Sequence, residues 1–283
     1  MTETPTMEAC AAQARAFIFD MDGTLVLGNS ASGEHEALPG AIELIDLLHR
    51  RNVPFRIFTN GTAQTPAAYA ASLRHAGFAI DDSEMMTPAT AAAEWFRNSG
   101  IGRVRTLGLE GVQQPLRDLG IEVIPPGQAA SDVEAVFTGW YREFTFPDLE
   151  QACRDIWAGA RIATASNVPF FAARGGRAIG ASYAINAMIR AMTGKRAKVL
   201  GKPAREALRC ALRLMELPPA AEKGTIVVGD DPALEMRMAR SAGAVGIAVT
   251  TGLTDAGALS LLPLAERPHF TIGTLGPLIE ALG

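Results

Sequence analysis

Acidic residues that could hold a metal ion follow two apolar segments of this 283-residue sequence. Asp20 and Asp22 come after the apolar run 16–19, and Asp230 and Asp231 come after the run 225–229. Carboxylates that lie close together stay ionised only if a cation neutralises them, and oxygen ligands favour a hard ion such as Mg²⁺. The sequence therefore predicts a magnesium site where these segments meet.

Three further polar residues follow apolar segments: Thr59 and Asn60 in FTNG, and Lys202 in GKP. A lysine and a hydroxyl beside a bound metal would hold the remaining oxygens of a phosphate group. Ligands of an open parallel sheet bind outside the carboxyl ends of its strands, which is where we expect all of these residues to lie. Together with the carboxylates, they supply the groups that phosphoryl transfer needs.

Four short motifs carry a resemblance to a known family. DMDGTL at 20–25, TN at 59–60, GKP at 201–203 and GDD at 229–231 resemble, in order and spacing, the motifs of the haloacid dehalogenase superfamily. The long insertion between the second and third motifs resembles class IIA, the NagD and p-nitrophenylphosphatase-like branch. The resemblance extends from about residue 14 to the end of the chain, and four ordered motifs are a specific signal where one would be weak.

The resemblance implies a fold and a reaction. The fold would be α/β, with a Rossmann-like parallel-sheet core and an inserted α/β cap of the C2 type. The reaction would be Mg²⁺-dependent hydrolysis of a small phosphomonoester through an aspartyl-phosphate on Asp20. Asp22 would protonate the leaving alkoxide and then deprotonate the attacking water.

The remaining roles are also implied by the resemblance. The Thr59 hydroxyl and the Asn60 backbone N–H would bind phosphate oxygens, and Lys202 would balance charge on the nucleophile and the phosphate. The metal ligands would be the Asp20 carboxylate, the Asp22 backbone carbonyl and the Asp230 carboxylate.

Two positions near the fourth motif depart from the family pattern. Asp231 stands where relatives usually have Asn or Arg, and Glu235 where they usually have a second Asp. Such changes could alter metal binding. We favour a simpler interpretation, in which Asp231 caps a helix that begins at Pro232 and Glu235 favours its first turn.

The inserted segment offers candidates for substrate specificity. Arg174, Arg177 and Tyr183 lie near the aromatic pair Phe170 and Phe171, and they could form a pocket for a small organic group with a second anionic or hydroxyl function. The same residues could instead pack the core of the cap or remain solvated. The stretch 140–142 (WYR) is open to the same two interpretations.

Alternating apolar segments predict the elements that position these groups. Strands are expected at 16–20, 53–59, 197–200, 225–229 and 245–250 for the core and at 104–109, 133–139 and 161–165 for the insertion. Helical spacing predicts helices over 41–48, from Pro203 to Met215 and from Pro232 to Ala242, the last ended by Gly243. We therefore expect a discontinuous core domain, 1–99 and 197–283, and a cap domain, 100–196.

The composition limits the setting. A formal net charge of −4 without a dense basic run argues against a nucleic acid polymer as partner, and no stretch is apolar enough to suggest a membrane span. The three cysteines are well separated in the sequence. The N-terminus does not show the basic segment followed by an apolar segment that is typical of a signal peptide. Both features favour a soluble cytoplasmic protein. The partner would be a small phosphorylated metabolite. The chain could form a homodimer. Two other functions stay open, namely a phosphotransferase or mutase and an inactive binding protein.

Overall fold

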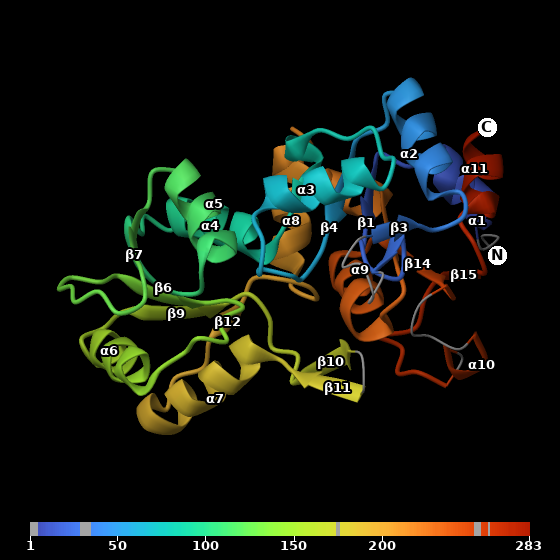
Figure 1. Cartoon of the computed structure of the whole chain (residues 1–283). Coiled ribbons are helices and arrows are strands. Elements are labelled where there is room, and N and C mark those ends of the chain that lie inside the picture. Colours follow the sequence, from blue (N-terminus) through green and yellow to red (C-terminus); the bar gives the residue numbers. More distant parts are fainter. Residues whose placement is uncertain (1–4, 29–34, 174–175, 252–255, 260) are drawn as a thin grey trace. The chain divides into compact units, whose positions relative to one another are not determined.

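The computed structural model describes residues 5–28, 35–173, 176–251, 256–259 and 261–283, which form an α/β fold (Figure 1). Two compact units are distinguished. The first contains Met1–Thr59, Tyr69–Met85 and Ala207–Gly283, and the second contains Asn60–Ala68 and Met86–Glu206. The predicted domain boundaries at 99/100 and 196/197 stay a prediction.

The first unit is built on a six-stranded sheet. Its strands, in spatial order, are β15 (Phe270–Ile272), β14 (Val245–Val249), β13 (Thr225–Gly229), β1 (Ala16–Phe19), β4 (Phe55–Phe58) and β5 (Met85–Met86). β1 pairs in parallel with β13 on one side and with β4 on the other. The parallel core sheet that the sequence predicts is confirmed.

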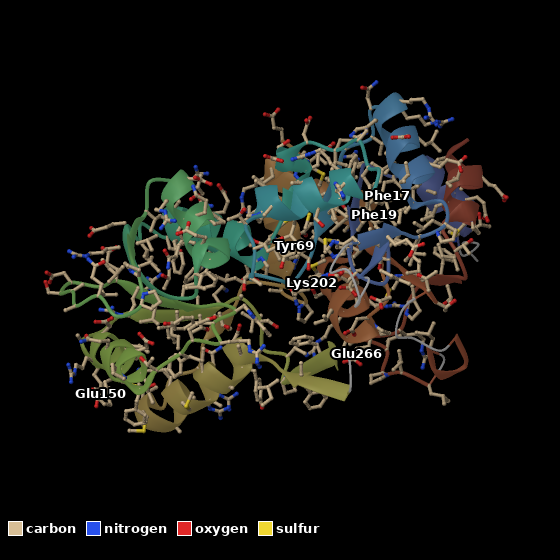
Figure 2. The ribbon with its side chains drawn as sticks, in the orientation of Figure 1. Phe17, Phe19, Tyr69, Glu150, Lys202 and Glu266 are labelled. Carbon is tan, nitrogen blue, oxygen red and sulfur yellow. The ribbon has the colours of Figure 1, made fainter. Side chains whose placement is uncertain are left out.

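All four residues of β1 are buried, so both faces of this sheet are covered. On one face the rings of Phe17 and Phe19 stack with centroids 5.6 Å apart (Figure 2). Helices that contribute buried side chains to this cluster are α1 (Met7–Ala12), α2 (Ala41–Arg50), α3 (Pro66–His75) and α11 (Gly276–Leu282).

The segment after β13 differs from the single helix expected over 232–242. It starts as a π-helical turn, Pro232–Met236, and continues as α9 (Arg237–Ala242), which ends at Gly243 in the left-handed conformation. Met236 packs with residues of β14 and α10 (Ala256–Leu259). A π-turn adds one residue to a helical turn, and a pattern of apolar spacing does not reveal it.

Two expectations near Lys202 are wrong. Pro203 does not open the next helix, because the Ala204 N–H donates to the Gly201 carbonyl and α8 begins only at Arg205 (α8, Arg205–Leu214). The segment 197–200 does not join the core series either, since its strand β12 (Lys198–Val199) pairs in parallel with a strand of the second unit.

The second unit has its own parallel sheet of five strands. In spatial order they are β12, β9 (Arg161–Thr164), β8 (Ala135–Thr138), β6 (Arg103–Leu107) and β7 (Glu122–Ile124). The ammonium of Lys198 in β12 binds Glu206 at 2.6 Å and lies over the ring of Trp95, 5.7 Å from its centroid. These contacts tie β12 to other residues of the second unit.

Helices cover both faces of the second sheet (Figure 1). On one face lie α4 (Pro88–Asn98) and α5 (Glu110–Asp118), and on the other lie α6 (Phe146–Trp157) and α7 (Ala181–Thr193). The inserted α/β unit that the sequence predicts is therefore present, with an apolar cluster on each face.

Smaller elements complete the chain. They are the antiparallel hairpins β2 (Val26–Gly28) with β3 (His35–Ala37) and β10 (Phe170–Ala173) with β11 (Gly176–Ile179), and 3₁₀ turns at Asp82–Glu84 and Pro219–Gly224. None of the helices in the described ranges combines the length and apolarity that a membrane crossing requires.

Candidate active site

The carboxyl edge of the first sheet carries three of the predicted site residues. Asp20 follows β1, Thr59 follows β4 and Asp230 follows β13. Because β13, β1 and β4 are parallel neighbours, their carboxyl ends lie side by side. The Asp20 backbone N–H also donates to the Val228 carbonyl at 2.9 Å, which fixes the start of the loop beside β13.

A tight turn brings the DMDGT segment against Asp230. Gly23 has φ +81°, and a Cβ atom there would lie 2.4 Å from Asp230 Oδ2, so only glycine fits. The Gly23 N–H donates to the Val26 carbonyl at 2.8 Å, and the Gly23 carbonyl accepts from Thr251 Oγ1 at 2.7 Å. The backbone of this turn is therefore held next to the Asp230 carboxylate.

The two carboxylates at this edge are both buried. Asp20 is 8% exposed and Asp230 is 5% exposed. Within the described residues no group of three or more His, Cys, Asp or Glu side chains forms a metal cluster. Mg²⁺ keeps several waters and needs only one or two protein carboxylates, so two buried carboxylates at the ends of neighbouring strands fit this ion.

Asp22 has a different environment from Asp20. Its side chain is 57% exposed, and His35 Nε2 lies 3.5 Å from Asp22 Oδ1. The other ring nitrogen of His35 lies 2.7 Å from Ser72 Oγ, which fixes the ring plane. His35 and Ser72 are distant in sequence from Asp22, and no motif singles them out.

The two departures from the family pattern have separate explanations. Asp231 Oδ1 accepts the Ala233 N–H at 2.9 Å, so the predicted helix cap is confirmed. Glu235 does more than favour a first turn. It is 1% exposed, its Oε2 accepts the Asp231 N–H at 3.0 Å, and it packs against Gly229, where a Cβ would lie 2.2 Å from Glu235 Cγ.

The second unit holds the other two predicted residues, Asn60 and Lys202, in direct contact. Asn60 Nδ2 donates to the Lys202 carbonyl at 3.0 Å, and the Lys202 N–H donates to Asn60 Oδ1 at 2.8 Å. Lys202, labelled in Figure 2, is 2% exposed. From the sequence we assigned a role only to the Asn60 backbone, so the contact made by its side chain was missed.

The loop after Asn60 is fixed to the second sheet. Buried Thr62 accepts the Trp140 N–H through Oγ1 at 2.8 Å, just beyond the end of β8. Gly111 in the first turn of α5 packs so closely that a Cβ would lie 2.4 Å from the Thr62 carbonyl oxygen. Thr62 and Gly111 were not identified from the sequence, because each is recognisable only by its partner.

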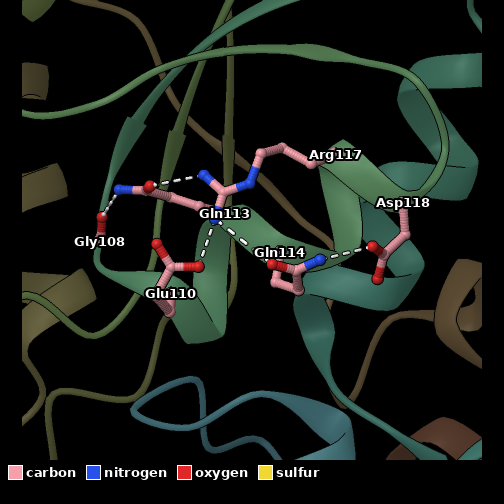
Figure 3. Close-up of polar contacts among 6 residues, drawn as sticks. All are labelled: Gly108, Glu110, Gln113, Gln114, Arg117 and Asp118. Carbon is pink, nitrogen blue, oxygen red and sulfur yellow. Dashed lines mark hydrogen bonds and ion pairs between the residues drawn. The ribbon is translucent and has the colours of Figure 1, made fainter.

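A chain of polar contacts runs along α5 (Figure 3). Gln113 Nε2 donates to the Gly108 carbonyl at 2.8 Å, and Arg117 Nη1 donates to Gln113 Oε1 at 3.0 Å. Arg117 also pairs with Glu110 in the first turn. The junction of β6 and α5 is therefore held by side chains of the helix itself.

The predicted specificity residues are only partly described. Arg174 lies outside the described residues, and for Arg177 only the backbone, in β11, is described. Tyr183 is exposed in the first turn of α7. Exposed Phe171 packs its ring against Trp140, with centroids 5.5 Å apart.

Tyr141 belongs to the core of the second unit. Burial, followed by the charge of Asp148 and a hydrogen bond to its carboxylate, raises the pKa of Tyr141 to about 12. The phenol stays protonated and donates to Asp148 Oδ2 at 3.3 Å. Thr164, the last residue of β9, is also structural, because its buried Oγ1 accepts from Asn186 Nδ2 at 2.7 Å.

Comparisons with known proteins agree with the motifs. The model of haloacid dehalogenase-like hydrolases matches residues 17–122, and a HAD-hydrolase-like model matches residues 199–278. A dihydroxyacetone phosphatase of Corynebacterium glutamicum is 27% identical over 94% of this chain and 90% of its own length.

Solved structures show the same fold. The 4-nitrophenylphosphatase from Thermotoga maritima is similar with a TM-score of 0.84 and 25% identity, over 97% of this chain and 99% of that one. The glycerol phosphate phosphatase from Mycobacterium tuberculosis in complex with magnesium is similar with a TM-score of 0.79 and 24% identity, over 96% of this chain and 77% of that one.

Proposed function

This chain belongs to the haloacid dehalogenase-like hydrolases and is a phosphatase, and from this premise we propose that it hydrolyses a small phosphomonoester through an aspartyl-phosphate on Asp20, with Mg²⁺ as cofactor. The observation that carries the proposal is the pair of buried carboxylates, Asp20 and Asp230, that follow the neighbouring strands β1 and β13, with the Gly23 turn packed against Asp230.

Mg²⁺ would be held by the Asp20 and Asp230 carboxylates and the Asp22 backbone carbonyl. When bound, it would neutralise charge on the phosphate and the nucleophile. Support comes from the buried state of both carboxylates and from the magnesium complex of the similar glycerol phosphate phosphatase.

In the first step an Asp20 oxygen attacks phosphorus, and the bond from phosphorus to the leaving oxygen breaks. Asp22 gives its proton to that oxygen. In the second step Asp22 takes a proton from water, and the water oxygen attacks phosphorus. The bond between phosphorus and the Asp20 oxygen breaks, which frees the Asp20 carboxylate and releases inorganic phosphate. The exposure of Asp22 supports this assignment, because the acid must reach both a substrate oxygen and water.

The phosphate oxygens would be bound by three groups: the Thr59 hydroxyl, the Asn60 backbone N–H and the Lys202 ammonium. Thr59 follows strand β4 of the first sheet, and Asn60 and Lys202 form a hydrogen-bonded pair in the second unit. A cationic ammonium and preorganised donors stabilise the charge that develops on a transferring phosphoryl group.

The substrate class that we propose is a small phosphorylated metabolite in the cytoplasm. The named relatives act on dihydroxyacetone phosphate, glycerol phosphate and 4-nitrophenyl phosphate, all of which are small. We also propose that a phosphoprotein is a poor substrate, because small-molecule sites enclose most of the surface of their ligand. A homodimer remains part of this proposal.

The test is a phosphate-release assay on the full chain with a panel of phosphorylated metabolites and p-nitrophenyl phosphate. Each substrate is assayed with Mg²⁺ and again with excess chelator. We expect release from at least one metabolite and from p-nitrophenyl phosphate, lost with chelator and restored by Mg²⁺. Turnover of p-nitrophenyl phosphate that is unaffected by metal removal would overturn the proposed role of Mg²⁺, and no release from any substrate would overturn the activity.

A further inference from the structure

We propose that the Asn60 side chain is a positioning residue that fixes the backbone of Lys202, so that the ammonium is presented to the phosphate in one place. This inference rests on the function proposed above. It concerns the side-chain amide of Asn60, whereas the phosphate contact assigned to this residue uses its backbone N–H.

Two hydrogen bonds join the Asn60 amide to the backbone of Lys202, and the amide is the donor in one and the acceptor in the other. The amide nitrogen donates to the Lys202 carbonyl at 3.0 Å, and the amide oxygen accepts the Lys202 N–H at 2.8 Å. Both distances are within the ordinary range for N–H···O bonds. A primary amide provides a donor and an acceptor at once, so it can satisfy both backbone groups of one residue.

The chain before Lys202 is packed too closely to move easily. A Cβ on Gly201 would lie 2.2 Å from the Ala165 carbonyl oxygen, 2.6 Å from Asn60 Oδ1 and 2.8 Å from Pro88 Cγ. The Leu200 N–H donates to the Thr164 carbonyl at 2.9 Å. The amide of Asn60 therefore holds Lys202 against the carboxyl end of β9.

Asn60 is itself held by the segment that comes after it. Thr62 accepts the Trp140 N–H, and Gly111 packs against the Thr62 carbonyl. The two chain segments 60–62 and 200–202 are thus fixed to the same sheet edge and to each other. Since Asn60 and Lys202 are 142 positions apart, only the fold creates this contact.

A fixed backbone matters for a lysine in this role. Lysine has a long flexible stem and a point charge, and it lacks the planar fork through which arginine sets its own geometry. A misplacement of about 1 Å can reduce catalysis roughly a hundredfold even when the chemistry is untouched. Loss of the Asn60 amide should therefore weaken the contribution of Lys202 without removing its charge.

A double-mutant cycle tests this dependence. We expect Asn60→Ala to lower kcat/KM for p-nitrophenyl phosphate by about tenfold to a hundredfold, and Lys202→Ala to lower it further. In the Lys202→Ala background, Asn60→Ala should cost less than about twofold more, because the residue that it positions is gone. Losses that multiply, or wild-type kcat/KM in Asn60→Ala, would overturn the inference.

A second readout does not depend on turnover. Lys202 is buried, so its acylation by an amine-reactive reagent, followed by mass spectrometry, should be slow in the wild type and several times faster in Asn60→Ala. Asn98→Ala, at an exposed asparagine that ends α4, is the matched control and should leave the labelling unchanged. Equal labelling in wild type and Asn60→Ala would also overturn the inference.

The two readouts separate this inference from the proposed function. If the wild type hydrolyses no phosphomonoester, the function fails while the labelling still reports on the Asn60 contact. If Asn60→Ala does not fold, Asn60→Asp takes its place in the labelling assay, because it matches asparagine in size, keeps the acceptor and loses the donor. Labelling at the wild-type rate in Asn60→Asp would then contradict the inference.

Discussion

The two parallel sheets of this chain differ in the residues at the carboxyl ends of their strands. In the first unit β1, β4 and β13 are followed by Asp20, Thr59 and Asp230. In the second unit β6, β8 and β9 are followed by Gly108, Gly139 and Ala165. Both edges are places where an α/β sheet can bind a ligand. Among the residues that follow these six described strands, those of the first unit carry carboxylate or hydroxyl groups and those of the second unit do not.

Glycine has a different use at each edge. At Gly23 a Cβ would meet the Asp230 carboxylate, so glycine lets a backbone turn approach a charged group. At Gly108 and Gly139 a Cβ would lie 2.3 Å and 2.2 Å from Val112 Cγ2, so glycine lets an apolar side chain of α5 close over the strand ends. At the ends of β6 and β8 the second edge is thus filled by its own chain. We infer that the first edge supplies the nucleophile and the metal ligands, and that the second unit is the scaffold that positions Asn60 and Lys202.

The largest expected effect is that of Asp20→Asn at the first edge. The variant keeps the size of the side chain but lacks the carboxylate nucleophile, so turnover should fall by at least about a thousandfold. The measurement is phosphate release with Mg²⁺, together with thermal unfolding to show that the fold is intact. Turnover at the wild-type rate would rule out a covalent intermediate on Asp20.

Substitutions in the core of the second unit should lower the free energy of unfolding rather than the turnover. Arg105 in β6 is fully buried and paired with Asp155 of α6, and its Nη1 donates to the Gln128 carbonyl at 2.7 Å. Asp155→Ala leaves a buried guanidinium without its carboxylate, which should cost about 3–5 kcal/mol of folding free energy. Urea unfolding measures the loss, and kcat per folded molecule for p-nitrophenyl phosphate should change little.

Replacement of the whole pair is the control for this prediction. Arg105→Met combined with Asp155→Leu removes both charges and fills similar space, so it should be more stable than Asp155→Ala alone. If the double variant is the less stable of the two, the buried charge is not the source of the loss.

Asp22→Asn should lower turnover by about a hundredfold or more, the usual contribution of a general acid and base. Its side chain is exposed, so stability should be close to that of the wild type. The loss in the phosphorylation step should be smaller for a phenolic leaving group than for an alkyl one, because a phenolate needs less protonation. Burst kinetics on both substrate types would show this, and equal losses would argue against Asp22 as the acid.

The first edge could be predicted from sequence because its signals are local. The run AFIFD places Asp20 at the end of a buried strand, and parallel neighbours bring Thr59 and Asp230 to the same edge. The roles of these residues follow from motifs and stay predictions. Two carboxylates of the expected magnesium site, Asp20 and Asp230, are buried at this edge, and the bound metal stays a prediction.

Some of the errors and omissions arise from long-range contacts. The apolar pattern at 197–200 predicts a strand but not its partner, and β12 pairs with β9 rather than with the core. The contact between Asn60 and Lys202 joins residues 142 positions apart. His35, near Asp22, has no motif of its own. Such contacts depend on how the elements pack, and periodicity within one segment contains no information about that.

A smaller effect is expected for Tyr183→Ala, which tests whether the scaffold unit also selects the substrate. Tyr183 is exposed at the start of α7, and Arg174 and Arg177 can be replaced in the same series. If these side chains contact the metabolite, kcat/KM for the preferred metabolite should fall several times more than for p-nitrophenyl phosphate, whose small ring needs few contacts. Equal effects on both substrates, or none, would remove these residues from the specificity site.

The smallest effect concerns stability at the outer edge of the first sheet. Burial, followed by the nearby Arg240 guanidinium, holds the pKa of His269 below its ordinary value of 6.5. The Gly246 N–H donates to His269 Nδ1 at 2.9 Å, a bond that requires this nitrogen to be unprotonated. The folded chain therefore binds a proton at His269 less readily than the unfolded chain.

The sign of the pH dependence follows from linkage. The stability due to neutral His269 is fully present above the unfolded pKa, near 6.5, and is lost as the pH falls from there through the lower folded value. His269→Asn keeps an acceptor for Gly246 and removes the titration, so its free energy of unfolding should fall less between pH 7 and pH 5 than that of the wild type. Urea unfolding at both pH values measures the difference, with His75→Asn as the control for the same change elsewhere. If the free energy of unfolding falls equally in wild type and His269→Asn between pH 7 and pH 5, His269 does not contribute to acid sensitivity. Protonation of other groups would then destabilise the molecule.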